Sequence, residues 1–310
     1  MKFLDAITMY LAHKHSLGYR FRSEEATLRA FLKRTGNIPI TMIETEAILA
    51  YFNINKAVTE FWFKKHQVLS GFFKFFLARE LIKISPVPRS IPQKTVADFV
   101  PYIYSSLEIK RLLDAIPAIC GARVPIDPDI LRTLILLLYS SGLRLGEALK
   151  LTLYDVDLKQ QYLRITETKF FKDRLVPMSS DLSKILIQHT EKLRLRYETS
   201  EKTPIFCFFD GLQLSQSATR NAFRRMRLYA GIQREGGSRR QPRIHDLRHT
   251  FAVHHLLAWY HNNENLQILL PKLAIYMGHV NLSSTQHYLT MTPELLNQAS
   301  LRFERYVKGE

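Results

Sequence analysis

Residues 158–178 read LKQQYLRITETKFFKDRLVPM, and within them the residue pattern changes from helical to strand-like. Two short segments, 162–166 and 174–177, alternate apolar and polar residues or are rich in strand formers, which is typical of β-strands. The residues between them predict a turn. The stretch therefore predicts a small hairpin in a helical domain, and the fold class is mainly α with a small β-sheet or hairpin (α+β).

Before the hairpin, the apolar helix pattern of residues 130–139 ends at Ser140-Ser141-Gly142. Arg144 follows within Gly142-Leu143-Arg144-Leu145-Gly146-Glu147, where glycine ends one helix and the arginine opens the turn into the next. Taken alone, an arginine beside a helix boundary is usually solvated. Its significance depends on the residues that follow it along the chain.

After the hairpin, helical patterns return at residues 181–197, 218–229, 245–259 and 269–277, with a basic loop at 231–242.

Three short motifs stand in this part: HDLRH at 245–249, MGH at 277–279 and HY at 287–288. His245 and Arg248 are three residues apart, so they share one face of a helix. An arginine flanked by histidines can bind a phosphate, and a tyrosine can attack it. These residue types therefore indicate cleavage of a phosphodiester.

Residues 3–83 carry apolar side chains at helical spacing, with breaks that divide them into four helices. In the last of these, Lys64, Lys65 and Lys74 lie between phenylalanines. Basic groups among aromatic ones can contact phosphates, but a phenylalanine stripe is more often core. A basic Pro-rich segment follows. It predicts a helical domain at 1–85, a linker at 86–103 and a second domain at 104–310.

The chain of 310 residues has a net charge of +16, divided equally between residues 1–97 and 98–310. Such a charge indicates a polyanionic partner, most commonly nucleic acid, with a generally basic protein as the alternative. Cys120 and Cys207 lie too far apart to form a metal or redox pair. The most apolar run, 134–138, is too short to span a bilayer. We expect a cytoplasmic protein that is neither exported nor bound to a membrane.

Five elements follow one another along the chain: GLRLGE at 142–147, Lys169 with RLVP at 174–177, His245-x-x-Arg248, Gly278-His279 and Tyr288. In this order they resemble the tyrosine recombinases, the lambda integrase and Xer group of the phage integrase family. The resemblance covers most of residues 100–300. It implies a two-domain DNA clamp and a site-specific DNA strand transferase.

The resemblance also implies the roles of the phosphate-binding residues. Arg144 and Arg248 would hold the nonbridging oxygens of the scissile phosphate, since guanidinium groups make paired, charge-assisted bonds to such oxygens. His245 and His279 would donate further hydrogen bonds. Because the two arginines and Lys169 supply positive charge, neither a metal nor another cofactor is implied.

Tyr288 would be the nucleophile, leaving a 3′-phosphotyrosyl link and a free 5′ hydroxyl without ATP. Lys169 would protonate the leaving 5′ oxygen, with Lys172 as the nearby alternative. His249 is interpreted as scaffold.

The implied partner is double-stranded DNA at recombination core sites, bound by a homo-tetramer that is a monomer or weak oligomer when free, with accessory recombinases as further partners. Candidate DNA contacts are the basic residues of the last N-terminal helix, the linker, the hairpin turn and the basic loop: Lys64, Lys65, Lys74, Arg89, Lys94, Lys172, Arg239 and Arg240. The apolar stripe of a helix at 293–307 is expected to dock on a neighbouring protomer, or alternatively on its own domain. We expect integration, excision or transposition of a mobile element in the bacterial cytosol or nucleoid.

Several alternatives stay open. Xer-like dimer resolution and topoisomerase-like nicking share this chemistry, and a catalytically silent relative would retain DNA binding alone. A metal hydrolase would use His245, His249, His254 and His255, which lack a His-Glu-x-x-His pattern. Compared with compact Xer-type members, Arg248 and His279 are far apart, and we expect a surface loop insertion at 260–265.

Overall fold

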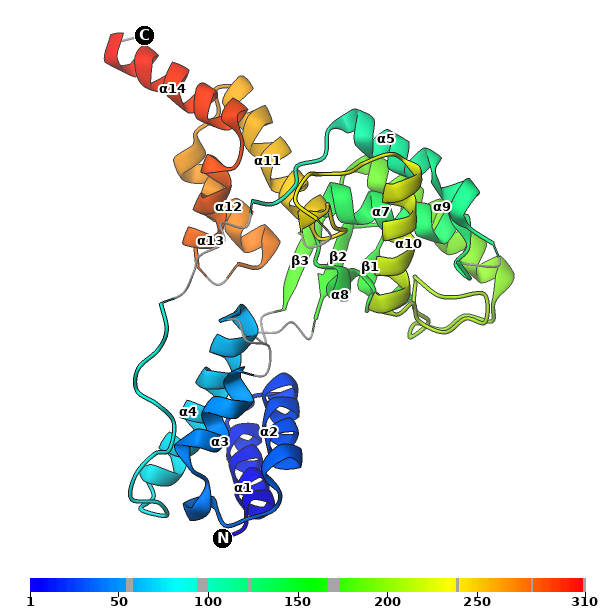
Figure 1. Ribbon diagram of the computed structural model, residues 1–310. Helices are drawn as coiled ribbons and strands as arrows, with labels where there is room; N and C mark the ends of the chain where they lie inside the picture. Colours follow the sequence, from blue (N-terminus) through cyan, green and yellow to red (C-terminus); the bar gives the residue numbers. More distant parts are fainter. Residues whose placement is uncertain are drawn as a thin grey trace. The chain divides into compact units, whose positions relative to one another are not determined.

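The computed structural model describes residues 1–53, 58–93, 100–121, 124–166, 173–237, 240–279 and 281–308, with side chains up to residue 301. The chain divides into two compact units, Met1–Asp98 and Phe99–Glu310, called here the N-terminal and C-terminal units (Figure 1). Within the described ranges, no helix is long and apolar enough to cross a membrane.

The N-terminal unit consists of the helices α1 (Phe3–Ser16), α2 (Arg22–Thr35), α3 (Thr45–Phe52) and α4 (Glu60–Leu77), with a 3-10 turn η1 (Ile40–Met42). Its core is aromatic. The ring of Phe3 packs edge-to-face against Phe31 and Phe72, with centroids 5.6 and 5.5 Å away. Phe72, Phe73 and Phe76 on α4 are fully buried. The phenylalanine stripe therefore forms core, as the spacing favours.

Lys65 is part of this core, and its place corrects the expectation that it contacts DNA. It is 3% exposed, and its Nζ donates to the carbonyl oxygen of Tyr51 at 2.8 Å. Burial lowers the pKa of its ammonium group. Lys64 and Lys74 are exposed on α4. The helical period turns Lys65 inward, so only the other two can reach a phosphate.

The expected linker at 86–103 begins inside the N-terminal unit. Val87 is buried in the aromatic core. Thr45 Oγ1 donates to the carbonyl oxygen of Pro86 at 2.9 Å. A ring nitrogen of His66 lies 3.1 Å from the carbonyl oxygen of Pro88. Prolines lack an N–H but still accept hydrogen bonds, so a Pro-rich segment can be held in place. Arg89, just beyond, is exposed.

The C-terminal unit is mainly helical, as predicted. Its elements are α5 (Ser106–Asp114), α6 (Ile116–Ile119), α7 (Pro128–Ser141), α8 (Leu145–Ala148), η3 (Leu153–Asp155), β1 (Val156–Asp157), β2 (Tyr162–Ile165), β3 (Arg174–Pro177), α9 (Ser180–Arg196), α10 (Gln216–Tyr229), α11 (Asp246–His261), α12 (Leu266–Met277), α13 (Ser283–Gln286), η5 (His287–Thr290) and α14 (Pro293–Lys308). The apolar helix α7 packs against α9 and α11 and carries much of the core.

The predicted hairpin is confirmed as the antiparallel pair β2–β3, in which Leu163 lies opposite Val176. Both side chains are fully buried, so one face of the sheet covers the core. β1 adds a third antiparallel strand beside β2. With two residues, β1 is too short to have a recognisable alternation.

A second core cluster joins α11, α12, η5 and the start of α14. Phe251, Met277 and Tyr288 belong to it, and so does Leu295 in the first turn of α14. The base of α14 therefore packs on its own unit, while the C-terminal end of this helix lies at the periphery of the unit in Figure 1. Leu296 and Leu301 are about half exposed, at 49% and 47%.

The surface loop expected at residues 260–265 is a tight turn. α11 continues to His261, and Asn263 adopts a left-handed φ of 54°. The side chain of Asn265 then caps α12 by accepting from the backbone N–H of Gln267 at 3.0 Å. Four of the six residues of the expected insertion therefore belong to a helix or cap one.

Candidate active site

Arg144 lies in the turn between α7 and α8. α7 ends at Gly142 with a φ of 59°, and a Cβ there would lie 2.4 Å from the ring of Phe251, so the turn needs glycine. Arg144 Nη1 donates to Glu147 Oε1 at 2.9 Å, and its Nη2 donates to the carbonyl oxygen of Gly278 at 3.1 Å. Its side chain is 36% exposed. The guanidinium is thus oriented while one side stays accessible.

Arg248 is buried on α11, at 3% exposure. Its Nη1 donates to the carbonyl oxygen of Gly142 at 2.6 Å and its Nη2 to that of Met277 at 2.7 Å. These carbonyls end α7 and α12, where the helix dipole favours a cation. Burial and the nearby Arg144 charge lower the pKa of Arg248 to about 10, so it stays charged at neutral pH. One guanidinium therefore joins the two helix ends.

Tyr288 lies on η5 and is 3% exposed. Its ring stacks on that of His279, with centroids 6.0 Å apart and planes 21° apart. His279 Nδ1 lies 2.7 Å from Thr285 Oγ1, which orients the imidazole. Burial raises the pKa of the Tyr288 phenol, against the opposing effect of the neighbouring Arg248. The phenol is protonated at neutral pH and lies beside a buried cation.

Two further histidines complete this cluster. The rings of His245 and His249 are perpendicular with centroids 5.1 Å apart, and that of His249 lies 5.6 Å from Tyr288. Although the side chain of His245 reaches solvent, desolvation and the Arg248 charge lower its pKa to about 4. Desolvation also lowers the pKa of His249 to about 3 and that of His279 to about 4. All three imidazoles are neutral at pH 7.

His249, for which a scaffold role is expected, lies beside the Tyr288 ring. Its Nδ1 is buried and has no hydrogen-bond partner among the described protein atoms. A buried polar atom in this situation costs about 1–3 kcal/mol. The contact with the Tyr288 ring makes His249 a member of the cluster.

Glu147 and Arg174 also belong to the cluster, and the sequence gives neither of them a role. Arg174 Nη2 donates to Glu147 Oε2 at 2.8 Å, and its Nε donates to the carbonyl oxygen of Tyr276 at 3.0 Å. Burial raises the pKa of the Glu147 carboxyl, but Arg174 and Arg144 outweigh it and lower that pKa to about 2. Glu147 ends the GLRLGE motif and Arg174 begins the RLVP motif, so their places in these motifs were the only sequence signal for a role in the site.

Four of the predicted site residues, Lys94, Lys169, Lys172 and Arg239, lie outside the described residues. The strand ends on either side of residues 167–172 are described, and Ile165 pairs with Arg174 there. The assignment of Lys169 therefore stays a prediction.

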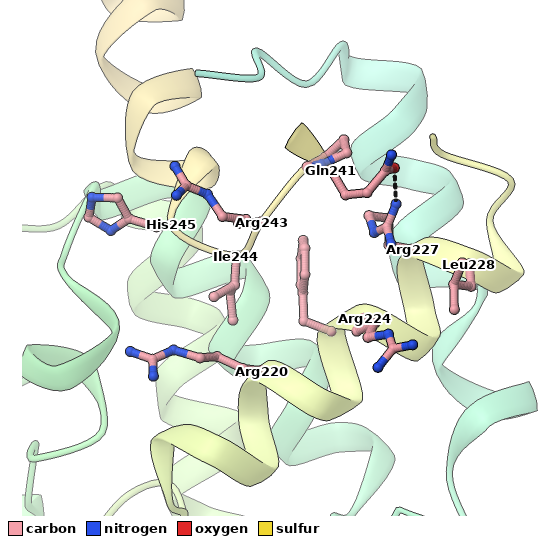
Figure 2. A pocket seen from close by; sticks show the side chains of 10 residues that line it. Arg220, Arg224, Arg227, Leu228, Gln241, Arg243, Ile244 and His245 are labelled. Atoms are coloured by element: carbon pink, nitrogen blue, oxygen red, sulfur yellow. Dashed lines mark hydrogen bonds between the residues drawn. The ribbon is translucent and has the colours of Figure 1, made fainter. Parts of the chain in front are cut away.

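A basic pocket of about 690 Å³ opens between α10 and the segment leading into α11 (Figure 2). Its lining includes Arg220, Arg224, Phe223, Ile244 and His245. Figure 2 shows Arg220 extending to the side of the pocket on which His245 lies. Neither Arg220 nor Arg224 belongs to a recognised motif, and both are exposed, as is Arg240. The basic surface next to the cluster around Tyr288 is therefore wider than the motifs indicate.

The histidines of the metal-hydrolase alternative do not converge. His254 Nδ1 lies 3.1 Å from the hydroxyl of Tyr139, and His255 Nδ1 lies 2.9 Å from the carbonyl oxygen of Phe251. In the described part of the chain, no three His, Cys, Asp or Glu side chains are placed to hold a metal ion.

The helical fold with its small sheet, and the arginines and histidines gathered around one tyrosine, define a tyrosine recombinase. Residues 105–294 match the model of the phage integrase family, and the chain belongs to this family. The resemblance noted in the sequence is confirmed. The chain is therefore an enzyme of the site-specific DNA recombinase type.

Three similar proteins match almost the whole length of this chain. An integrase/recombinase of Sinorhizobium fredii, y4rE, is 33% identical over 310 residues, covering 96% of this chain and 94% of the relative. A lambda integrase dimer bound to a core site has a TM-score of 0.67 at 18% identity, covering 92% of this chain and 97% of that one. The Tn1549 transposon integrase with transposon right end DNA has a TM-score of 0.70 at 15% identity, covering 98% and 99%. These two structures share the fold.

Proposed function

We propose that the C-terminal unit cleaves and rejoins duplex DNA through a covalent bond to Tyr288. The observation that carries this proposal is the position of the Tyr288 ring, stacked on His279 and beside the buried Arg248. Arg144 is tied to the same place because it donates to Gly278, the residue before His279. We infer that the tyrosine hydroxyl and the two guanidinium groups act on one phosphate.

In the proposed reaction, the guanidiniums bind the nonbridging oxygens and stabilise the charge that develops in the transition state. Arg248 has five N–H donors, of which the two helix-end carbonyls take two. His245 and His279 donate hydrogen bonds from their neutral imidazoles. The site can therefore bind an anion without first adding a proton to either imidazole.

The phenolic oxygen of Tyr288 bonds to phosphorus and the bond from phosphorus to the 5′ oxygen breaks. A neutral imidazole of the cluster takes the phenolic proton, and Lys169 gives a proton to the leaving 5′ oxygen. The reverse reaction, with a 5′ hydroxyl of another strand, rejoins the DNA. The bond energy is conserved, so strand exchange needs no ATP.

The proposed substrate is double-stranded DNA at a core site of a mobile element. The net charge of +16 favours a polyanion. The lambda and Tn1549 integrases that share this fold are bound to DNA in their structures. Phosphate contacts are proposed for the exposed Lys64, Lys74 and Arg89 of the N-terminal unit, and for Arg240 and the basic pocket of the C-terminal unit.

The proposed assembly is a homo-tetramer on DNA. The base of α14 is anchored by Leu295, whereas Leu296 and Leu301 leave apolar surface exposed further along. Such a face on a terminal helix favours docking on a neighbouring protomer. Deletion of residues 297–310 would keep the anchor and is expected to abolish tetramers on paired sites.

The cleavage assay uses nicked duplexes tiled across the DNA that flanks the gene, so that the cleaved strand end is lost and the adduct accumulates. We expect the wild-type chain to form a covalent adduct with and without a metal chelator. Tyr288→Phe is expected to form none. Tyr276→Phe is a matched control, because this hydroxyl bonds to the carbonyl oxygen of Pro177 instead. Adduct formation by Tyr288→Phe, or its loss in chelator, would contradict the proposal.

A further inference from the structure

Arg174, the first residue of β3, has an almost fully enclosed guanidinium. Its side chain is 9% exposed. Nη2 and Nη1 donate to the two carboxylate oxygens of Glu147 at 2.8 and 3.2 Å, and Nε donates to the carbonyl oxygen of Tyr276 at 3.0 Å. Bidentate pairing fixes both the distance and the plane of the two groups. One side chain therefore ties β3 to α8 and to α12.

Glu147 lies between Arg174 and Arg144. Its Oε1 accepts from Arg144 Nη1 at 2.9 Å and its Oε2 from the Arg144 backbone N–H at 3.1 Å. Because Arg174 also holds both carboxylate oxygens, Glu147 meets the Arg144 guanidinium through one nitrogen only. The Nη2 of Arg144 is directed to Gly278 instead.

Gly278 forms the second contact surface of the Arg174 guanidinium. It ends α12 with a φ of 68°, and a Cβ there would lie 2.9 Å from Arg174 Nη1. The Arg174 guanidinium therefore packs directly on the turn that precedes His279. A side chain at residue 278 would have to displace it.

We propose that Arg174 is a positioning residue for DNA cleavage, an inference that rests on the proposed function. Through Glu147 it sets the direction of the Arg144 guanidinium, and through the end of α12 it sets the position of His279. Arg174 begins β3, two positions after residue 172, so the same contacts tie the second strand of the hairpin to the phosphate-binding groups.

A buried ion pair can also serve stability alone, and Arg174→Gln separates the two roles. In a stability role, the cleavage rate per folded molecule is unchanged. In the positioning role, the uncompensated carboxylate of Glu147 binds Arg144 through both oxygens and withdraws it from the phosphate. Misplacement of a catalytic group by about 1 Å costs on the order of 100-fold in rate. DNA affinity depends on many phosphate contacts and should fall by less than about 5-fold.

Removal of the carboxylate gives an independent readout. In the double variant Arg174→Gln with Glu147→Gln, no charge remains to capture Arg144. We expect the double variant to cleave about 10-fold faster than Arg174→Gln alone, a direction that simple loss of stability would not give. Arg174→Lys keeps the charge but not the bidentate geometry, and its rate should be intermediate.

The experiment measures single-turnover adduct formation at saturating DNA, DNA affinity and thermal unfolding for the full-length variants. The control is Arg196→Gln, which removes a 2.6 Å ion pair to the largely buried carboxylate of Asp127; the Arg196 side chain itself is 47% exposed. We expect Arg174→Gln to lose about 100-fold in rate per folded molecule and Arg196→Gln to stay within about 3-fold of wild type. Equal rates for these two variants, or a double variant no faster than Arg174→Gln, would overturn the proposal.

If Arg174→Gln does not fold, two other variants test the proposal. Arg174→Lys removes the bidentate geometry, and Gly278→Ala adds a methyl group that displaces the Arg174 guanidinium. Both should lower the rate far more than DNA affinity, and rates equal to wild type would refute the role. Failure of the proposed function gives a different result: the wild-type chain would then form no adduct that depends on Tyr288.

Discussion

Arg248 donates a hydrogen bond to the carbonyl oxygen of Gly142 at 2.6 Å, although 106 residues separate them in sequence. The second bond of the same guanidinium reaches Met277 at the end of α12. Arg144 stands two positions after Gly142, and His279 stands two positions after Met277. A single buried cation thus brings distant motifs to one place.

Replacement of Arg248 by lysine tests this link. An ammonium group has no planar fork, so it cannot reach both helix ends. We expect Arg248→Lys to lower the free energy of unfolding by about 1–3 kcal/mol, because buried carbonyls lose charged donors. The adduct should form at least about 100-fold more slowly. Arg194→Lys, at an exposed position on α9 with no proposed DNA contact, is the control for both measurements, and equal behaviour of the two variants would contradict the link.

Gly142→Ala tests the turn that presents Arg144. Gly142 and Gly231 both have positive φ values, of 59° and 65°, but only at Gly142 does a Cβ meet another side chain, the ring of Phe251. Gly231→Ala should cost about 1 kcal/mol from backbone strain. Gly142→Ala should cost on the order of 3 kcal/mol, because overpacking is added to the strain. Equal melting temperatures for the two variants would show that the close contact is not a constraint.

Acidic pH is expected to destabilise the C-terminal unit. The pKa values of His249 and His279 are lowered to about 3 and about 4, whereas histidines of the unfolded chain titrate near their ordinary value of about 6.5. Below pH 6.5 the unfolded state therefore binds more protons than the folded state. The contribution of the two neutral histidines to the free energy of unfolding is fully present above pH 6.5 and is lost as the pH falls towards 4. Thermal unfolding from pH 8 to pH 4 measures this trend. His249→Phe should reduce the slope, and an unchanged slope would argue against a neutral, buried His249.

The lysines of α4 should differ in DNA binding. Lys64 is exposed, whereas Lys65 is buried and bonded to Tyr51. If Lys64 contacts a phosphate, Lys64→Met lowers affinity and reduces the slope of log K against log salt by about 1. Lys65→Met should leave this slope unchanged and affect stability. Salt titrations of both variants decide the matter, and a reduced slope for Lys65→Met would restore it as a DNA contact.

Local patterns predicted much of the fold. Alternation at Leu163 and Ile165 identified β2, and the glycine at residue 142 identified the end of α7. Two-residue strands carry no period, so β1 had no signal. Which face of α4 is buried depends on how the other three helices pack against it. Lys64 and Lys65 are adjacent and both stand among phenylalanines, so the sequence did not show which of the two points inward.

The candidate site was only partly predictable for a similar reason. The order of motifs pointed to Arg144, Arg248 and Tyr288, because each motif is local. The pairing of Glu147 with Arg174 joins α8 to β3, and neither residue type alone signals it. The position of His249 against Tyr288 likewise depends on how η5 packs on α11.

The most direct test of the account is mass spectrometry of the peptide that carries the DNA after the covalent adduct is digested with protease and nuclease. We predict a single modified peptide containing Tyr288, with a 3′-linked nucleotide on the phenolic oxygen. A nucleotide attached to any other residue, or through a 5′ phosphate, would contradict the account.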